Sequence, residues 1–573
     1  RVWSAWCAVS DETHSTTQPT DEADAHYRHG IAQATDGRYD EAIVALRKTV
    51  SINPNHIDAQ KHLAIALAAS GKTEAAIAVL REIVRRAPEH ADAYALLGNA
   101  LIEHDDLEQA IEAYRHAVAL QPTDVNTLNN LGNALADVGR TNEAITVYRQ
   151  AIAHHPSMMS TYHNLGRLFV DLDDAAAAAD LYRTALKIEP SHPVILTDLG
   201  VSLARRNYQK EAIACYRQAL ETDSDNPTTH YNLGNALWAT GNLDAAMTSF
   251  RAALQHSPEN ADAHVNLGMI QLSCGNFHDG WKEYEWQWRR ENAPRRPFPA
   301  SPWNGTNLAG SNVFLHSEQG LGDELFFLRF IPWLKKQGAG EITYQPNPKI
   351  ASILARTKML DWIAAHNTRP SDTDIVFSVG DLPRLLGMEH PEQAPAPFKL
   401  SPLPEQVAVV RQRLSECGSP PYVGVTWRGG TKNKKNVLYK ETHPAEIGAS
   451  LKGVPATILI LQRLPQEDEV NIFCEALGRP AHDLSGLNEN LEQMLALLLL
   501  LDDYVGVSNT NMHLRAGVGK TARVLVPAPP EWRWMAEGRT SPWFPGFTVY
   551  RQGYDGNWDT AFAELAADLK SLS

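Results

Sequence analysis

Small and apolar residues recur through the first half of the chain with a period of 34 residues, and a different pattern begins near Ser311. A proline marks one position of the period, at Pro54, Pro88, Pro122, Pro156, Pro190 and Pro258, and Ser224 fills the gap. A glycine marks a second position, at Gly30, Gly98, Gly132, Gly166, Gly200, Gly234 and Gly268. Alanine stands twelve residues after the glycine position, at Ala42, Ala76, Ala110, Ala144, Ala178, Ala212 and Ala246. The pattern predicts internal repeats.

Each period is long enough for two helices joined by a turn. Such helices approach closely where their side chains are small, and a proline stops the second helix. At these positions the repeats resemble the tetratricopeptide repeat. The resemblance implies an α-solenoid with seven full repeats from near Ala23, and an eighth whose second helix changes character over residues 280–288.

A polar column stands two residues before the glycine position, at Asn130, Asn164, Asp198, Asn232 and Asn266. Asparagine in a helix costs roughly 0.5 kcal/mol or more relative to alanine, so helix propensity does not explain the column. An amide both donates and accepts, and can therefore bind the backbone of an extended peptide. The column resembles the asparagine ladder of protein O-GlcNAc transferases, which implies peptide binding on the concave surface. The alternative is that each asparagine bonds to the neighbouring repeat and only orders the stack.

The second half begins with four prolines in residues 292–302, which end the helices and indicate a domain boundary. From Ser311 onward short apolar segments alternate with amphipathic ones, including an expected helix over residues 325–336. The expected strands cover residues 313–316, 341–344, 422–427, 456–461, 503–507 and 522–526. This alternation predicts two parallel α/β units.

Length and composition narrow the class of protein. The 573 residues exceed the ~250–300 residues at which a single core stops growing, so we expect several domains. The net charge of -15 gives no basic surface for nucleic acid, and the five cysteines form no Cys-x-x-Cys pair. The longest apolar run, residues 494–501, is far shorter than the ~20 residues of a membrane span, and residues 1–7 lack the apolar stretch of a signal peptide. We therefore expect a cytoplasmic protein without a membrane span or a nucleic-acid partner.

A glycine-containing loop, Gly320-Leu-Gly322-Asp323, lies between a predicted strand and a predicted helix. A dinucleotide fingerprint would need a third glycine in place of Leu325 and an acidic residue in place of Tyr344-Gln345, so NAD is not expected. Residues 317–332 instead resemble the first loop of the ADP-heptose heptosyltransferase family, and especially its bacterial branch fused to tetratricopeptide repeats. Further stretches match in the family's order, at residues 427–430, 461–462, 506–514, 516–519, 529–534 and 541–545.

The resemblance implies a GT-B fold, in which two Rossmann-like lobes face each other across a cleft. The acceptor then lies toward the first lobe and the nucleotide-sugar toward the second. The expected division is a flexible segment 1–22, repeats 23–291, a proline-rich linker 292–310, an N-terminal lobe 311–415, a C-terminal lobe 420–548 and a closing helix within 549–573 that returns to the first lobe.

Asp323 matches the family position that acts as general base in inverting transfer, where it would take the proton of the acceptor. The alternative is that Asp323 only complements the positive end of its helix. Glu318 and Glu324 are neighbouring carboxylates that could take the same role, and their spacing does not rank them.

The donor site is expected where a strand leads into a helix at residues 508–511, because free backbone amides there bind a diphosphate. The residues expected to contact the donor are Arg428, Lys440, Gln462, Ser508, Asn509, Thr510 and His513. Arg428 and Lys440 would supply positive charge to the diphosphate. Gln462 and Arg463 would contact the base of the nucleotide. The alternatives are a solvated loop for the cations and a structural role for His513. The family usually has Asp where Ser508 stands, which puts the donor or the activity itself in question.

A metal site is not expected. Asp372-Thr-Asp374 imitates the Asp-x-Asp metal motif, but it precedes a strand, and the resemblance to GT-B enzymes implies protein groups in place of a metal. No cofactor is expected besides the nucleotide-sugar co-substrate.

Together with the repeats, the resemblance implies an inverting, metal-independent glycosyltransferase that moves a sugar from a nucleotide-sugar to a protein or peptide, at Ser or Thr, held by the repeats. Two alternatives stay open. One is a heptosyltransferase-like enzyme acting on a glycan or a lipid-linked saccharide, and the other is a non-catalytic protein-binding scaffold with a degenerate transferase domain. The donor, the acceptor and homo-oligomer formation are left open.

Overall fold

The computed structural model describes residues 21–291, 293, 308–317, 320–365, 373–429 and 440–570. The chain divides into two compact units, Arg1–Ser224 and Asp225–Ser573. The division falls inside the predicted repeat segment 23–291, so the last repeats belong to the same unit as the α/β region. Glu318 and Asp372, both singled out from the sequence, lie outside the described residues.

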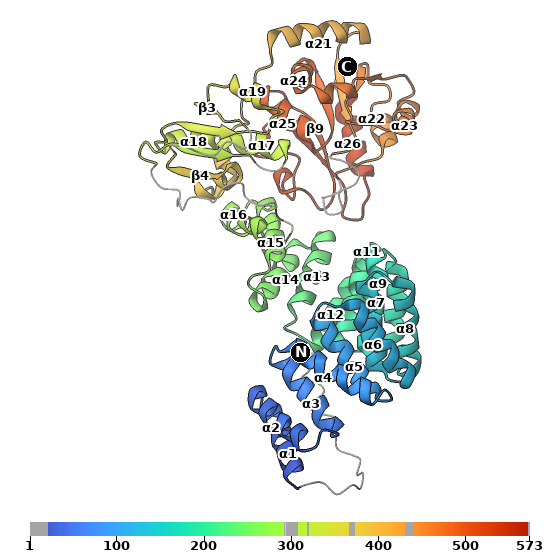
Figure 1. Cartoon of the computed structure of the whole chain (residues 1–573). Coiled ribbons are helices and arrows are strands. Elements are labelled where there is room, and N and C mark those ends of the chain that lie inside the picture. The colour runs from blue at the N-terminus through green and yellow to red at the C-terminus, as the bar shows by residue number, and fades with distance from the viewer. Residues whose placement is uncertain are drawn as a thin grey trace. The chain divides into compact units, whose positions relative to one another are not determined.

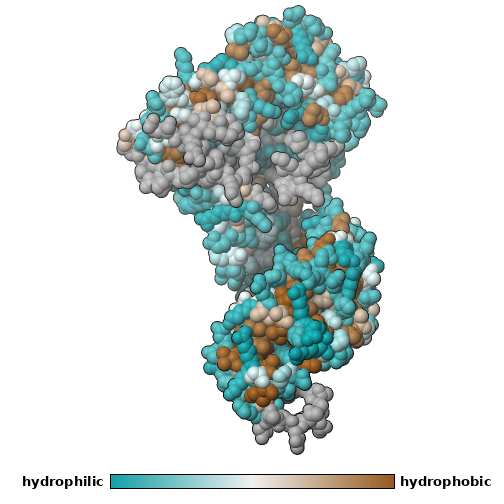
Figure 2. All heavy atoms as spheres, in the orientation of Figure 1, coloured by the Kyte–Doolittle hydropathy of each residue, from teal (hydrophilic) through white to brown (hydrophobic). Residues whose placement is uncertain are grey.

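The N-terminal unit consists of helix pairs (Figure 1). They are α1 (Asp21–Thr35), α2 (Tyr39–Ile52), α3 (Ile57–Ala69), α4 (Thr73–Arg86), α5 (Ala91–Glu103), α6 (Leu107–Leu120), α7 (Val125–Asp137), α8 (Thr141–His154), α9 (Met159–Asp171), α10 (Ala175–Leu186), α11 (Pro193–Arg205) and α12 (Gln209–Thr222). On the face that Figure 2 presents, hydrophobic residues gather over this unit.

The C-terminal unit opens with two further pairs, α13 (Pro227–Ala239), α14 (Leu243–His256), α15 (Ala261–Ser273) and α16 (Phe277–Tyr284). The last helix is short and continues as the 3-10 helix η2 (Glu285–Arg289). These pairs confirm the predicted tetratricopeptide solenoid. The change from α16 to a 3-10 helix falls within residues 280–288, where the sequence predicted that the second helix of the last repeat becomes irregular.

The glycine position lets the two helices of a repeat touch. A Cβ atom added to Gly132 would lie 2.5 Å from Cε1 of Tyr148, and one added to Gly234 would lie 2.8 Å from Cε1 of Phe250. Both rings belong to the second helix of the same repeat and are buried. The glycine therefore leaves the space that the aromatic ring fills.

Two parallel sheets follow the repeats. The first has the strand order β3-β2-β1-β4, with β1 (Val313–His316), β2 (Ile342–Gln345), β3 (Trp362–Ile363) and β4 (Ile375–Ser378). The second has the order β10-β9-β8-β5-β6-β7, with β5 (Tyr422–Thr426), β6 (Thr457–Ile460), β7 (His482–Asp483), β8 (Asp503–Val507), β9 (Arg523–Val526) and β10 (Thr548–Arg551). In the first sheet Val313 pairs with both Ile342 and Ile375. Parallel sheets with helices are compatible with the expected α/β class.

The connecting helices are α17 (Leu321–Phe327), η3 (Leu328–Phe330), α18 (Ile331–Lys336), α19 (Ala351–Ala355), η4 (Val379–Asp381), α20 (Leu382–Leu385), η5 (Pro391–Gln393), α21 (Pro404–Cys417), α22 (Pro444–Ser450), α23 (Glu467–Leu477), η6 (Ser485–Glu489), α24 (Leu491–Leu500), α25 (Thr510–Gly517), η7 (Trp532–Trp534) and α26 (Asp559–Leu569). The helix expected over residues 325–336 begins earlier and contains a 3-10 turn. Pro332 has no N–H for the carbonyl of Leu328, which accepts from Ile331 instead.

The last helix, α26, differs from the expected closing helix. It packs on α22 and β10. Its buried residues Ala561, Leu565 and Leu569 share a core with Val423 and Ile447, which belong to the second sheet and its helix. Because α26 directly follows the edge strand β10, it returns to the face of that same sheet. No return to the first sheet is seen in the described contacts.

An aromatic junction joins the last repeat to both sheets. It consists of Phe277 and Trp281 from α16, Phe326 from α17, and Trp532 and Trp543 from the segment after β9. Ring centroids lie 5.0 Å apart for Phe277 and Trp543, 5.1 Å for Trp281 and Trp532, and 5.2 Å for Phe326 and Trp532. This contact explains why the last repeats belong to the α/β unit.

In the part of the chain that the structure describes, none of the helices combines the length and apolar character needed to cross a bilayer.

The glycine contact can be tested with Gly234→Ala. The added methyl group must displace the buried ring of Phe250, so we expect the C-terminal unit to lose about 1–3 kcal/mol of unfolding free energy. Gly486→Ala is the matched control, because a Cβ atom there meets nothing within 4 Å. Calorimetric melting of both variants measures the difference. Equal melting temperatures would contradict the role assigned to the glycine.

Candidate functional site

The carboxyl ends of the two sheets meet through α17 and α25, which pack on each other. Helix α17 follows β1, and α25 follows β8. A Cβ atom added to Gly322 would lie 3.2 Å from Cδ2 of His513, so the first turn of α17 lies close to this ring on α25. The ends of parallel strands are where α/β sheets bind ligands, so this contact marks the candidate site.

Asp323 reaches across this junction to the second sheet. Its carboxylate forms an ion pair with the guanidinium of Arg533 in η7, and Arg533 also pairs with Glu531. The Arg533 side chain is only 6% exposed, whereas that of Asp323 is 45% exposed. Burial alone lowers the pKa of Arg533, but the carboxylates of Asp323 and Glu531 raise it above its ordinary value. Arg533 is therefore a permanent buried cation, and Asp323 keeps an accessible side.

Glu531 gathers three donors on one buried carboxylate. Its Oε2 accepts from Lys440 Nζ at 2.6 Å and from Ser508 Oγ at 3.0 Å, while Oε1 accepts from Arg533. Burial alone raises the pKa of the Glu531 carboxyl, yet the charges of Lys440 and Arg533 hold that pKa well below its usual range. Glu531 is thus an anion that binds two of the residues predicted to contact the donor.

His513 lies buried beside this cluster. Burial, followed by the charge of Arg533, lowers the pKa of its imidazole well below the ordinary value, so the ring is neutral. Its Nδ1 has no hydrogen-bond partner among the described residues. A neutral imidazole with a spare nitrogen can bond to a ligand, but it adds no charge to the site.

The other two residues at the start of α25 have different surroundings. Asn509 is the N-cap of α25, and its Nδ2 donates to Thr426 Oγ1 at 2.9 Å. Thr510 is half-buried in the first turn. Asn509 therefore fixes the turn, and the N-terminal amides of α25 follow it.

Arg428 and Gln462 make structural bonds that sequence reasoning did not foresee. Arg428 forms a buried ion pair with Glu469, and its Nη2 donates to the carbonyl of Leu464 at 3.2 Å. Gln462 Oε1 accepts the backbone N–H groups of Trp427 and Arg428 at 3.0 and 2.8 Å. The Arg428 guanidinium is thus already paired with Glu469, and Gln462 holds the backbone of residues 427 and 428, directly after β5.

Two further residues discussed from the sequence, Arg463 as a donor contact and Asp374 in the rejected metal motif, lie at the edge of the site or away from it. Arg463 is half-exposed, with its Nε 3.4 Å from Glu489. Asp374 stands before β4, at the amino end of the first sheet, and accepts from the backbone N–H of Asn312 at 2.8 Å. Among the described residues no cluster of three His, Cys, Asp or Glu side chains could hold a metal ion.

The polar column bonds to neighbouring helices. Asn130 donates to Asn99 Oδ1 and Asn164 to Asn129 Oδ1, both at 3.1 Å, and Asn266 donates to Asn235 Oδ1 at 2.8 Å. Asp198 bonds to His163 Nδ1 at 2.6 Å. Asn232 is half-buried on α13. Three of the amides thus order the stack with their N–H groups, and no bond to their side-chain oxygens is found among the described residues.

The column also divides between the two units. Asn130, Asn164 and Asp198 belong to the N-terminal unit, and Asn232 and Asn266 to the C-terminal one.

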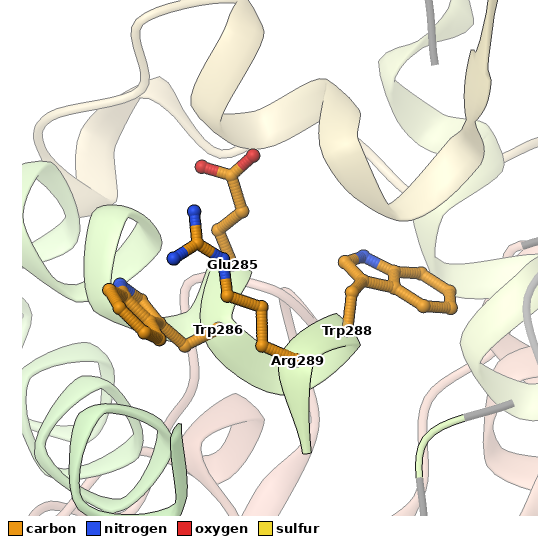
Figure 3. Close-up of a pocket in the computed structure, with 4 residues that line it drawn as sticks. All are labelled: Glu285, Trp286, Trp288 and Arg289. Carbon is orange, nitrogen blue, oxygen red and sulfur yellow. The ribbon is translucent and has the colours of Figure 1, made fainter. Parts of the chain in front are cut away.

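A pocket of about 260 Å³ lies at η2, where the last repeat ends (Figure 3). Glu285, Trp286, Trp288 and Arg289 line it, and none was assigned to a site from the sequence. The rings of Trp286 and His264 are stacked, with their centroids 3.9 Å apart. The guanidinium carbon of Arg289 lies 4.1 Å from the centroid of Trp286. Because both faces of Trp286 are covered, Trp288 is the indole that a ligand could meet.

Glu531, Arg533 and Glu469 are the charged residues of the site that sequence reasoning missed. Glu531 and Arg533 belong to the stretch 529–534, which was noted only for its resemblance. The signal available in the sequence was a pair of charged residues, Glu531 and Arg533, that alternate with tryptophans in the segment after a strand. Charge at such a place has to be paired when it is buried.

Family models identify the repeats. Those described as tetratricopeptide repeat match residues 34–100 and 123–191, and one described as TPR repeat matches 98–139, 202–241 and 234–275. The chain therefore carries tetratricopeptide repeats, a scaffold suited to protein binding. These matches end before the α/β region, whose resemblance to glycosyltransferases stays a prediction.

The chain is also similar to protein FlbA of Caulobacter vibrioides, with 25% identity over 329 residues. The similarity covers 53% of this chain and 54% of FlbA, so the chain spans about half the length of that curated relative.

Three solved structures show a partial likeness. MamA is 27% identical, covers 28% of this chain and 94% of its own, and has a TM-score of 0.27. YrrB, described as a TPR protein with an unusual peptide-binding site, is 20% identical with coverages of 32% and 95% and a TM-score of 0.27. A thermophilic TPR protein of Thermus thermophilus, TTC0263, is 21% identical with coverages of 32% and 99% and a TM-score of 0.27.

Glu324, next to Asp323, provides a pH-dependent test of the site. Its Oε1 accepts from Tyr344 Oη at 2.7 Å and from the Asn347 N–H at 2.9 Å, and its buried Oε2 has no partner among the described residues. Burial raises the pKa of this carboxyl to about 7, from 4.5, despite the two hydrogen bonds. Protonated Glu324 is therefore more stable in the folded protein than the ionised form. Its stabilising contribution is lost as the pH rises through 7.

Glu324→Gln imitates the protonated acid at every pH. We therefore expect this variant not to lose stability as the pH rises. A shift of this size corresponds to at most about 3 kcal/mol, so wild type should weaken relative to the variant between pH 5 and pH 8. Urea unfolding of the C-terminal unit at both pH values measures it, with the exposed Glu405→Gln as control. Parallel pH profiles for wild type and Glu324→Gln would refute the raised pKa.

Proposed function

We propose that the chain is a glycosyltransferase that moves a sugar from a nucleotide-sugar to a protein or peptide bound by the repeats. The observation that carries the proposal is the meeting of Asp323, at the carboxyl end of the first sheet, with the Ser508, His513 and Lys440 cluster of the second. Sugar transfer requires a general base near the acceptor and hydrogen-bond donors near the departing diphosphate. The family resemblance of both segments points the same way.

The parallel sheets support a GT-B arrangement, since two lobes with facing carboxyl edges would bring an acceptor and a donor together. In this proposal Asp323 is the base. The amides at the start of α25, with Ser508, Thr510, His513 and Lys440, receive the diphosphate. Arg428 and Gln462, which were expected to contact the donor, are assigned instead to the packing of residues 427 and 428 directly after β5.

A second candidate is a protein-binding scaffold with an inactive transferase region. The observation in its favour is that both predicted phosphate-binding cations already have carboxylate partners, Arg428 with Glu469 and Lys440 with Glu531. A nucleotide-sugar panel, scored by the intact mass of acceptor proteins, separates the candidates. Transfer by wild type supports the enzyme, and its absence with every donor supports the scaffold.

The base is tested with Asp323→Asn, which keeps the size of the side chain and its place in α17. If Asp323 takes the acceptor proton, turnover should fall about 10²- to 10⁴-fold while donor affinity barely changes. Asp374→Asn is the control, because it removes a carboxylate at the opposite end of the same sheet. Near wild-type turnover for Asp323→Asn would exclude this base and move the search to its neighbours.

The asparagine ladder is tested with the double variant Asn130→Ala and Asn164→Ala in the N-terminal unit. We expect weaker binding of an acceptor peptide, because two side-chain oxygens that could meet its backbone are removed. Each lost bond between repeats should also cost about 0.5–1.5 kcal/mol of stability. Asn126→Ala, an exposed asparagine on the same helix α7, is the control. Lower stability with unchanged peptide affinity, measured by fluorescence anisotropy, would leave the ladder a purely structural role.

A further inference from the structure

The Glu531 carboxylate occupies a place built like an anion-binding site. Its three donors come from separate segments: Ser508 follows β8, Arg533 follows β9, and Lys440 lies between β5 and α22. Lys440 Nζ and Ser508 Oγ both meet Oε2, at 2.6 and 3.0 Å, and Arg533 meets Oε1. Phosphate oxygens accept hydrogen bonds from these same kinds of donor.

The backbone around Lys440 is fixed close to Ser508. Gly429 N–H donates to the Lys440 carbonyl at 2.7 Å, and Thr442 N–H donates to the Trp427 carbonyl at 2.9 Å. A Cβ atom added to Gly429 would lie 2.6 Å from the Ser508 carbonyl oxygen. The glycine therefore lets the segment after β5 lie directly against the end of β8, with Lys440 beside it.

The charges of the cluster cancel. Arg533 and Lys440 carry two positive charges, and Asp323 and Glu531 carry two negative ones. The neighbouring Arg428 is likewise balanced by Glu469. These six residues therefore carry no net charge, and each of the three cations among them has a carboxylate partner.

Lys440 is the cation of the cluster that solvent reaches. Its side chain is 24% exposed, compared with 8% for Glu531 and 6% for Arg533. An incoming anion would therefore meet Lys440 first and compete with Glu531 for it.

We propose that Glu531 is the resident anion of a phosphate site, and that the diphosphate of a nucleotide binds by taking Lys440 and Ser508 from Glu531. This inference rests on the proposed function, because it names the group that the donor must displace. Glu531 then sets the affinity of the site: it keeps the cations paired when the site is empty and weakens the binding of every diphosphate.

The proposal is tested with Glu531→Gln. Glutamine keeps the size of the side chain and an oxygen for Ser508 and Lys440, but it removes the competing charge. Wild type and variant are titrated calorimetrically with inorganic pyrophosphate and with ADP, GDP, UDP and CDP. We expect the variant to bind the best diphosphate about 10- to 150-fold more tightly, the range of one charge-assisted bond. Equal or weaker binding would overturn the proposal and make Glu531 a residue that holds Lys440 in place.

Controls separate the site from general charge effects. Glu537→Gln removes an exposed carboxylate from the same segment and should leave the affinity unchanged. Lys440→Gln should abolish the gain when it is combined with Glu531→Gln. If Glu531→Gln does not fold, Glu531→Asp keeps the charge but draws it away from Lys440. It should then bind more tightly than wild type, and failure to do so contradicts the proposal.

The titrations also distinguish this inference from the proposed function. Tighter pyrophosphate binding by the variant, with no preference for any nucleoside diphosphate, would support the anion site and count against a nucleotide donor. Nucleoside diphosphate binding that Glu531→Gln does not strengthen would support the donor and refute the resident anion. No binding of any probe by either protein would refute both.

Discussion

The aromatic junction of Phe277, Trp281, Phe326, Trp532 and Trp543 is the contact on which the C-terminal unit depends. Its rings come from the last repeat, the first sheet's helix α17 and the segment after the second sheet's β9. Arg533 lies over this cluster, with its guanidinium carbon 4.6 Å from the Phe326 centroid and 4.5 Å from that of Trp532. The rings hold a buried cation between the sheets, and that cation needs the carboxylates of Asp323 and Glu531. Apolar packing thus determines where the charges of the candidate site can be.

Regular spacing made much of the fold predictable from the sequence. The repeat period fixes where each glycine, alanine and proline stands, and each helix pair contacts its neighbours within some 34 residues of sequence. Short apolar segments between amphipathic ones placed the six expected strands within a residue or two, whereas β3, β7 and β10 were not among them. The 3-10 turn before Pro332 was not predicted from the sequence. It depends on the carbonyl of Leu328, which Pro332 leaves without its usual helical N–H donor. The packing of α26 also depended on a neighbour, β10, that the expected strands did not include.

The candidate site was harder to predict because its pairs join distant residues. Asp323 and Ser508 were found through motifs, but nothing local to Asp323 indicates Arg533, 210 residues further on. Arg428 was expected to supply positive charge to the donor because it follows a strand, with a solvated loop as the alternative. Its partner Glu469 belongs to another helix, and only the fold brings the two together. Sequence motifs therefore identified the segments of the site, whereas the ion pairs determine which of their side chains remain accessible.

The chain of charges also links the acceptor side to the donor side. Arg533 holds Asp323 with one nitrogen and Glu531 with another, and Glu531 in turn holds Lys440 and Ser508. In the proposed function, a diphosphate that takes Lys440 leaves Glu531 with Arg533 as its remaining cation. Because Arg533 bonds to Asp323 and to Glu531 through different nitrogens, it can keep both carboxylates at once. Arg533 is therefore the buried charge that the acceptor side and the donor side share.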